Sequence, residues 1–126
     1  MKLSVVIPVY KNKELLMGSL AHNYQYLKKH EVIIVDDASG VGIKKEVHKK
    51  FPSIIIIEHT ENTGFSQTVN DGVAIAKGTY IFLLNSDVKL CDNSFEKAVD
   101  QLEKDNTLFA ISFAQIEKDG RIVGKN

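Results

Sequence analysis

The sequence predicts an α/β fold with a mostly parallel sheet flanked by helices and followed by a C-terminal hairpin. Three observations support this prediction. Short apolar runs rich in β-branched residues alternate with segments of helical periodicity, which is the order of βαβ units. The runs are apolar on both faces, as buried parallel strands are. Near the C-terminus, Asp119-Gly120 lies between Ile116 and Ile122, a pattern typical of a hairpin turn.

Each predicted strand is a short apolar run that ends at a proline, a turn residue or a polar cluster. The third run is entered through Pro52, whose missing N–H does little harm at the start of a strand. The fifth run leads into the predicted hairpin. In chain order, the runs are Ser4–Ile7, Val32–Val35, Ile54–Ile57, Thr79–Leu84 and Leu108–Phe113.

The segments between these runs are predicted to be helices because their apolar residues recur three or four positions apart. Asn12 is a candidate cap for the first helix, and Asp92 or Asn93 for the last. Gly78 is a candidate end for the third helix. The apolar stripes are Leu16, Leu20, Tyr24 and Leu27; Ile43, Val47 and Phe51; Phe65, Val69, Val73 and Ala76; and Phe95, Val99 and Leu102.

Length and composition bound the class of protein. The 126 residues suit one compact domain, so we expect residues 1–126 to form a single domain. The formal net charge of +0 argues against a nucleic-acid partner, which usually needs a basic face. The lone Cys91 cannot form a disulfide within the chain and favours a reducing, cytoplasmic location. No segment of the sequence has the length of a membrane span, so any contact with the inner face of a membrane is expected to be peripheral and to involve another part of a longer protein.

Acidic residues follow two of the predicted strands directly. Asp36-Asp37 comes after the run that ends at Val35, and Asn85-Ser86-Asp87 comes after the run that ends at Leu84. The carboxyl ends of parallel strands meet at one edge of a sheet, where α/β proteins bind their ligands. The two clusters therefore predict one polar crevice suited to a metal ion and phosphates.

Asp87 and Asp37 each have a functional and a structural interpretation. The Asp87 carboxylate, with the Asn85 oxygen beside it, suits Mg²⁺ or Mn²⁺ shared with a nucleotide diphosphate. Alternatively, Asp87 only begins a turn. The Asp37 carboxylate can accept a hydrogen bond from N3–H of uracil or thymine. Alternatively, Asp36 or Ser39 caps the next helix.

The polar loop Asn62-Thr63-Gly64 precedes the third predicted helix. Its glycine suits a positive φ or a close approach of the backbone to a ligand, and a helix N-terminus can face an anion. The spacing matches neither the dinucleotide-binding fingerprint nor the P-loop. The four histidines show no metal-ligand spacing and are interpreted as surface or helix-end residues: His22, His30, His48 and His59.

Taken together and in this order, the segments resemble the nucleotide-sugar-binding half of family 2 glycosyltransferases, which have the Rossmann-like GT-A fold. The resemblance covers about residues 3–113, and it is specific because four motifs occur in the right order and structural context. The residues that carry it are Ser4–Tyr10 with Asn12; Val35–Ser39; Glu61–Gly64 with Ser66, Asn70, Gly72, Ala76, Gly78 and Tyr80; and Leu84–Asp87.

The resemblance implies inverting transfer of a sugar from a nucleoside diphosphate donor, UDP- or dTDP-linked, to an acceptor hydroxyl on a glycan or a lipid-linked acceptor. This chemistry belongs to the synthesis of polysaccharides and cell-surface glycans. Carried over by position, the segment Pro8, Val9 and Tyr10 would cradle the base and Asp37 would hydrogen-bond it. The donor pocket would be shaped by further residues of the loop and the helix, namely Asn62, Gly64 and Asn70.

The segment Asn85-Ser86-Asp87 occupies the place of the family's DxD motif. The resemblance implies that Asp87 binds a divalent cation, Mg²⁺ or Mn²⁺, and that Asn85 touches the ribose or the metal's shell, with Ser86 between them on the donor. Asn85 departs from the usual acidic residue, so it keeps an oxygen acceptor but loses a charge. This variant resembles the branch that includes rhamnosyltransferases, which favours a deoxysugar donor.

A second departure concerns catalysis. The family's general base is an Asp or Glu in the second half, and a general base must lie within hydrogen-bond reach of the acceptor hydroxyl. We therefore expect the catalytic residue beyond Asn126. The chain is then a truncated part of a longer enzyme, inactive in isolation, or a natural short homologue.

Two other classes of protein share features of this sequence. A receiver-like signalling module has a similar length and an acidic pair, but that pair follows the first strand rather than the second, and here Glu58 stands where the phosphoacceptor Asp is expected. A sugar nucleotidyltransferase carries a glycine-rich basic loop after its first strand. The segment Tyr10–Glu14 contains no glycine.

Overall fold

The computed structural model describes residues 2–116 and 122–123. The chain forms two compact units, Met1–Asp92 and Asn93–Asn126. The first unit holds the sheet and both acidic strand ends. A single nucleotide-sugar-binding domain over residues 1–126 stays a prediction.

The first unit is built on a four-stranded, fully parallel sheet with the order β3-β2-β1-β4. The predicted α/β fold with a mostly parallel sheet is therefore confirmed. β1 and β2 are the interior strands and are buried almost throughout, as their β-branched sequences predict. The strands are β1 Leu3–Val9, β2 Glu31–Asp36, β3 Ile55–Glu58 and β4 Tyr80–Leu83.

The strand register brings the carboxyl ends together at one edge. Val9 pairs with Asp36, and Asp36 pairs with Glu58, so β1, β2 and β3 end level with one another. On the other side of β1, Leu83 pairs with Val6, so β4 ends slightly lower. The loops after all four strands therefore begin at the same edge of the sheet.

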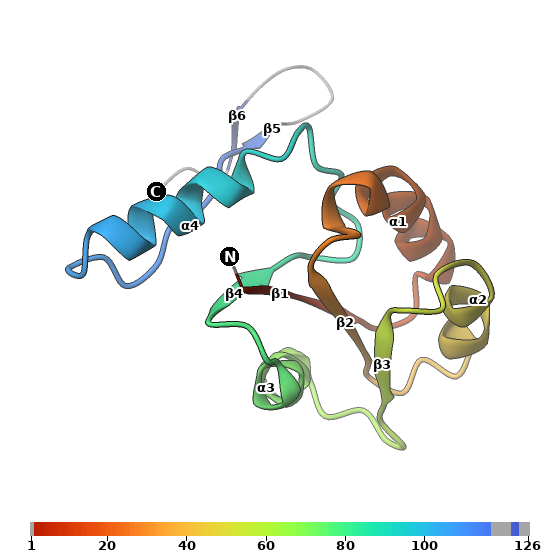
Figure 1. The fold of residues 1–126 in the computed structure, drawn as a ribbon. Helices are drawn as coiled ribbons and strands as arrows, with labels where there is room; N and C mark the ends of the chain where they lie inside the picture. The colour runs from red at the N-terminus through yellow and green to blue at the C-terminus, as the bar shows by residue number, and fades with distance from the viewer. Residues whose placement is uncertain (1, 117–121, 124–126) are drawn as a thin grey trace. The chain divides into compact units, whose positions relative to one another are not determined.

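Three helices cover the two faces of this sheet. α1 spans Lys13–Leu27, α2 spans Ile43–Lys50 and α3 spans Phe65–Ile75. Figure 1 shows α1 and α2 on one face and α3 on the other. Right-handed crossovers require this arrangement, because the first two connections move along the sheet in one direction and the third returns past β1 to β4.

α3 packs on the sheet through small residues, which differs from the predicted stripe. Phe65 is 59% exposed and Val73 is 41% exposed, whereas Thr68 and Gly72 are buried. A Cβ at position 72 would lie 2.6 Å from Cγ1 of Val6. The predicted stripe is wrong because close approach of the helix to the sheet, rather than side-chain size, decides which face is buried.

Gly78 does not end α3, which stops at Ile75 with Ala76 extended. Instead, the N–H of Gly78 donates to Oγ of Ser4 at 2.8 Å, and that hydroxyl donates to the Glu31 carboxylate at 2.6 Å. A Cβ at position 78 would lie 2.6 Å from the Ser4 nitrogen. Gly78 therefore permits a close approach of two backbones at the amino end of the sheet.

The start of α1 also differs from the prediction. Asn12 occupies the N-cap position, but its φ of 51° is left-handed and its side chain makes no capping hydrogen bond. Its carbonyl instead accepts from the N–H of Leu16 at 3.0 Å. The side-chain cap is excluded because the tight turn after β1 places both Lys11 and Asn12 at positive φ.

The second unit contains α4 (Phe95–Lys104) and the antiparallel pair β5 (Gln115–Ile116) and β6 (Ile122–Val123). Ser94 occupies the N-cap of α4, so neither Asp92 nor Asn93 does. The predicted strand Leu108–Phe113 is wrong, because these residues have no regular secondary structure. The β5–β6 pair supports the predicted hairpin, whose turn Asp119-Gly120 lies outside the described residues.

Candidate functional site

The site forms where β1 and β2 end. The N–H of Asp37, one residue past β2, donates to the carbonyl of Val9 at 2.9 Å. Beyond this pair, the N–H of Lys11 donates to the Ser39 hydroxyl, and the N–H of Ser39 donates to Oδ1 of Asp36 at 3.1 Å. The two loops after these strands are therefore held together, and the Asp36 side chain closes a turn rather than capping α2, whose N-cap is Gly42.

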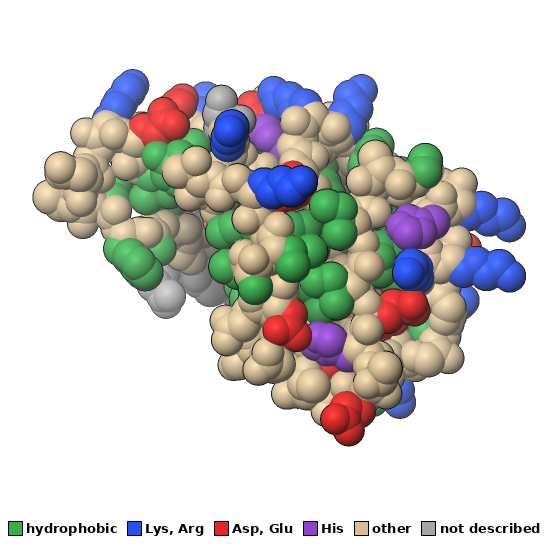
Figure 2. All heavy atoms as spheres, turned by 60° about the horizontal axis from the view of Figure 1, so that its bottom comes forward, with side chains coloured by type: hydrophobic (Ala, Val, Ile, Leu, Met, Phe, Trp, Pro, Cys, Tyr) green, Lys and Arg blue, Asp and Glu red, His purple; other side chains and the backbone are tan. Residues whose placement is uncertain are grey.

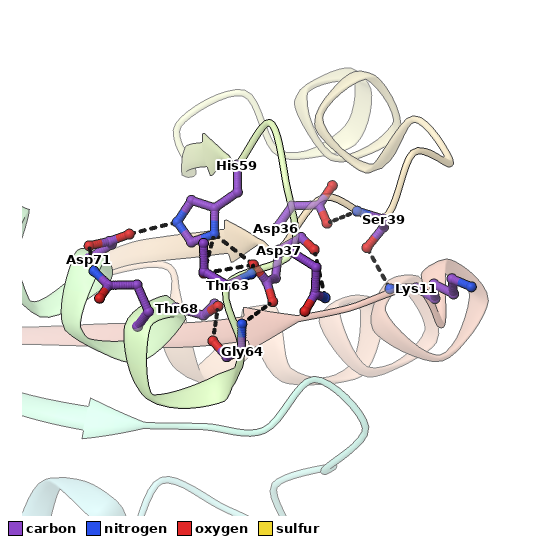
Figure 3. Close-up of polar contacts among 11 residues, drawn as sticks. Lys11, Asp36, Asp37, Ser39, His59, Thr63, Gly64, Thr68 and Asp71 are labelled. Carbon is purple, nitrogen blue, oxygen red and sulfur yellow. Dashed lines mark hydrogen bonds and ion pairs between the residues drawn. The ribbon is translucent and has the colours of Figure 1, made fainter.

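The Asp37 carboxylate is buried and strongly hydrogen-bonded. Its Oδ1 accepts from the N–H and the hydroxyl of Thr63 at 2.8 and 2.9 Å and lies 2.8 Å from Nδ1 of His59, while its Oδ2 accepts from the N–H of Gly64 at 2.9 Å. Figure 3 shows these groups converging on it. Burial raises the pKa of Asp37, but the hydrogen bonds from His59, Thr63 and Gly64 outweigh burial and hold the pKa well below its usual range.

His59 lies between two carboxylates. Its Nδ1 faces Asp37, and its Nε2 lies 2.7 Å from Oδ2 of Asp71 on α3 (Figure 3). The hydrogen bond to Asp37 raises the pKa of His59; burial opposes this, and Asp71 adds to it. The interpretation of His59 as a surface residue is wrong, because its side chain is only 11% exposed. A usable signal was its position just after β3, the same signal that marked Asp37.

The loop Asn62-Thr63-Gly64 is held by Asp37. The side-chain N–H of Asn62 donates to the Asp37 carbonyl at 3.4 Å. Gly64 has a φ of 93°, which side chains rarely adopt, and it is the N-cap residue of α3. Its carbonyl accepts from the Thr68 hydroxyl at 2.7 Å. Asp37 therefore fixes both the loop and the start of α3.

The Asn85-Ser86-Asp87 segment forms a tight turn after β4. The carbonyl of Asn85 accepts from the N–H of Val88 at 3.2 Å, which places Ser86 and Asp87 at the two central positions. The Asn85 and Asp87 side chains are exposed. On the far side of the turn, the Asn23 side chain on α1 donates to the Val88 carbonyl at 2.8 Å. The turn is thus closed by its own hydrogen bond and held to α1 at Val88, with Asp87 at one of its central positions.

Other residues singled out in the sequence lie at or near this edge in different settings. Pro8 and Val9 are buried within β1, and Tyr10 follows them with 46% of its surface exposed. The Lys11 ammonium lies 5.4 Å from the centre of the Tyr10 ring. Asn70 is exposed on α3, away from the buried Thr68–Gly72 side, and the network around Asp37 does not include it.

The donor atoms at the Asp87 turn suit a shared metal. Among the described residues, no group of three or more His, Cys, Asp or Glu side chains is arranged to hold an ion. The turn instead offers one carboxylate and one amide oxygen. Mg²⁺ and Mn²⁺ are often bound by one or two carboxylates together with substrate phosphates. The residues therefore fit a cation held jointly by Asp87 and a diphosphate.

A hollow of about 680 Å³ lies between the end of β3 and α3. Figure 2 shows acidic side chains gathered around a histidine on this side of the molecule. Its wall includes Thr63 but neither Asp37 nor Asp87, so it borders the predicted donor site rather than forming it. The lining residues are Glu58, His59, Thr60, Glu61, Thr63, Gln67 and Asp71.

Comparison with known proteins decides the family. The model of glycosyl transferase family 2 matches residues 4–125. The chain belongs to this family. A mannosyltransferase of Pyrobaculum calidifontis in complex with GDP-Man and Mn²⁺ matches with a TM-score of 0.71 at 24% identity, over 80% of this chain and 32% of that one. Staphylococcus aureus TarS in complex with UDP-GlcNAc also gives 0.71, at 21% identity over 82% and 32%. These matches establish the GT-A fold.

Curated relatives include two glycosyltransferases named for poly(ribitol-phosphate). A poly(ribitol-phosphate) beta-glucosyltransferase of Bacillus spizizenii is 37% identical over 69% of this chain and 15% of the relative. The poly(ribitol-phosphate) beta-N-acetylglucosaminyltransferase TarP of S. aureus is 28% identical over 98% and 40%. The chain thus spans less than half of either relative. Within its described part, none of the helices is both long and apolar enough to span a bilayer.

Proposed function

We propose that this chain is the donor-binding part of an inverting glycosyltransferase, which transfers a sugar from a UDP- or dTDP-sugar to an acceptor hydroxyl. The observation that carries the proposal is the placement of Asp37 and Asp87. They follow β2 and β4, the two strands that flank β1, in a sheet whose parallel strands all end at one edge. In α/β proteins, this edge is where ligands bind. Family membership supports the same assignment.

In this proposal, the base lies against the end of β1. Pro8 and Val9 form a rigid floor because they belong to a buried strand, and the exposed Tyr10 ring offers a flat apolar surface. Asp37 accepts the N–H of the base. The Asn62–Gly64 loop closes the neighbouring wall, with Asn70 contributing from α3.

The diphosphate is assigned to the Asn85–Asp87 turn. Asp87 supplies a carboxylate to a divalent cation, Mg²⁺ or Mn²⁺, and Asn85 and Ser86 supply neutral polar groups to the ribose or the cation's shell. A cation bound here would offset the charge of the diphosphate leaving group. The hydrogen bond between Val88 and Asn85 and the contact of Asn23 with Val88 hold the backbone of the turn that carries Asp87.

The catalytic base, the acceptor and the cellular location are proposals about the whole protein. The general base is expected beyond Asn126, and a glycan or a lipid-linked molecule is the acceptor. The names of the relatives in B. spizizenii and S. aureus support a role in cell-surface glycan synthesis. A cytoplasmic location, peripheral at the inner face of the membrane, belongs to the same proposal.

Titration calorimetry tests donor binding by this chain. UDP, dTDP and GDP are titrated with and without Mn²⁺. We expect UDP or dTDP to bind more tightly with Mn²⁺ and GDP to bind more weakly than either. Absence of binding for every nucleotide, with and without the metal, would contradict the proposal.

A matched pair of variants tests the metal ligand. Asp87→Ala is expected to remove the effect of Mn²⁺ on nucleotide affinity while leaving the fold intact, because the side chain is exposed. Asp100→Ala removes an exposed carboxylate from α4 and is expected to keep the effect. Equal Mn²⁺ dependence in the two variants would show that Asp87 is not the ligand.

A further inference from the structure

The contacts of His59 limit which protonation states of the ring can satisfy both of its neighbours. Nδ1 lies 2.8 Å from an Asp37 oxygen and Nε2 lies 2.7 Å from an Asp71 oxygen. A carboxylate can only accept, and a neutral imidazole carries one N–H. If both aspartates are ionised, only the imidazolium, with two N–H groups, satisfies both contacts at once. A neutral ring would direct a lone pair at one of the carboxylates.

The surroundings of His59 favour the cationic form. Asp37 faces it from the end of β2, and Asp71 faces it from α3, where the Gln67 amide donates to the other Asp71 oxygen at 2.7 Å. The hollow around His59 also includes Glu58 and Glu61 in its wall. Among the described residues that line the hollow, none is a lysine or an arginine. An imidazolium at His59 would therefore balance this acidic group of side chains.

The hydrogen bonds also distinguish the two oxygens of Asp37. Oδ1 is engaged by His59 and twice by Thr63, whereas within the described part of the chain Oδ2 accepts only from the Gly64 N–H. A carboxylate oxygen has two lone-pair directions, so Oδ2 keeps one for a further donor. His59 and Thr63 thus hold Oδ1, Gly64 holds Oδ2, and Oδ2 keeps one lone-pair direction for a further donor.

We propose that His59 is a positioning residue that, as an imidazolium, orients the Asp37 carboxylate so that Oδ2 accepts the N–H of the donor's base. This role rests on the proposed function of the site. It deepens that function by making the affinity for the nucleotide depend on the charge of a histidine outside the predicted binding motifs. Loss of the His59 proton removes the charged partner of Oδ1 and leaves the carboxylate held by Thr63 and Gly64 alone, so its orientation toward the base is less restricted.

The test combines a spectroscopic readout with nucleotide affinity. Nitrogen-15 NMR of the ring nitrogens of His59 is expected to show an imidazolium at pH 7 that titrates above the usual value of about 6.5. The dissociation constant of UDP or dTDP is expected to rise about tenfold across that titration, the size of one charge-assisted hydrogen bond. At pH values below the His59 midpoint, His59→Gln is expected to bind the nucleotide about tenfold more weakly than wild type. At pH values above that midpoint, the affinity of the variant should change little further.

Matched variants keep the proposal falsifiable. His48→Gln replaces a histidine of α2 whose ring contacts the Ile54 carbonyl, outside this network, and it should behave as wild type. Asp71→Asn leaves Asp37 unchanged but removes the carboxylate that faces Nε2 of His59. The pH midpoints of the NMR titration and of nucleotide binding should therefore both fall. This variant also serves if His59→Gln does not fold.

Different failures lead to different conclusions. A neutral His59 ring at pH 7, or a His59→Gln variant with the affinity and pH profile of wild type, overturns the role of His59 alone. Unchanged pH midpoints of the NMR titration and of nucleotide binding in Asp71→Asn would also overturn the role of His59. A wild-type protein that binds neither UDP nor dTDP at any pH overturns the proposed function and this role with it.

Discussion

The side chain of Asn23 is bound to the backbone of Val88. Its N–H₂ group donates to the Val88 carbonyl at 2.8 Å, and its oxygen accepts from the N–H of Leu90, also at 2.8 Å. Asn23 is only 2% exposed. The Asn23 amide thus makes one donor and one acceptor hydrogen bond with the segment after Asp87, as the backbone of a paired strand would. α1 therefore determines the path of the chain as it leaves the predicted metal-binding turn.

Asn23→Ala is expected to destabilise the protein and to loosen this segment. The change leaves a part-buried carbonyl and a part-buried N–H without their partner, and the total cost should be about 1–3 kcal/mol. Urea unfolding measures the stability, and hydrogen exchange measures the protection of the Leu90 amide. Asn23→Asp keeps the acceptor for Leu90 but not the donor to Val88, so the Leu90 amide should stay more protected than in Asn23→Ala. Unchanged exchange at Leu90 in Asn23→Ala would refute this account.

Gly72→Ala and Gly18→Ala are expected to have opposite effects on stability. At position 72, a Cβ would meet Cγ1 of Val6 at 2.6 Å and Cγ2 of Val35 at 3.0 Å. Valine side chains have little freedom to move aside, so overpacking should cost about 1–3 kcal/mol. At position 18, inside α1, the new Cβ meets nothing within 4 Å beyond the adjoining backbone of its own helix, and alanine should stabilise the helix by about 0.5–1 kcal/mol. Thermal unfolding measures both, and midpoints that shift in the same direction contradict the packing argument.

Asp37 predicts a loss of stability in acid. Its folded-state pKa is depressed, so it contributes stability above its unfolded pKa of about 3.9 and loses that contribution as pH falls through the folded-state value. The free energy of unfolding in urea should therefore decrease from about pH 5 downward. Asp37→Asn should be less stable at neutral pH and show a flatter acid profile. A variant profile parallel to that of wild type would rule out this source of acid sensitivity.

His59 predicts the opposite dependence on the alkaline side. Its folded-state pKa is raised, first by the hydrogen bond to Asp37, so its contribution is complete below the unfolded pKa of about 6.5. That contribution is lost as pH rises through the raised value. Urea unfolding between about pH 6 and pH 9 should show this decline in wild type and much less of it in His59→Gln. An equal decline in both proteins would assign it to other groups.

Much of the fold follows from local sequence. The β-branched runs of β1 and β2 and the alternation of strand and helix predict a parallel sheet, and this sheet is confirmed. Asp37 and Asp87 were found by the same reasoning, because each follows a strand by a few residues and parallel strands end at one edge. Leu108–Phe113 shows the limit of this approach. The run is as apolar as the strands but has no regular secondary structure, because apolar composition alone does not determine the backbone conformation.

The sequence by itself determined which strands form, that they run parallel and that acidic residues stand at their carboxyl ends, since these properties depend on neighbours along the chain. Only the tertiary structure decided which partners those residues have. His59 meets Asp37 across 22 residues, His59 meets Asp71 across 12, and Asn23 meets Val88 across 65. Such hydrogen bonds exist because helix and sheet packing brings distant parts of the backbone within reach of each other. The periodicity of the sequence does not indicate which distant residues will meet.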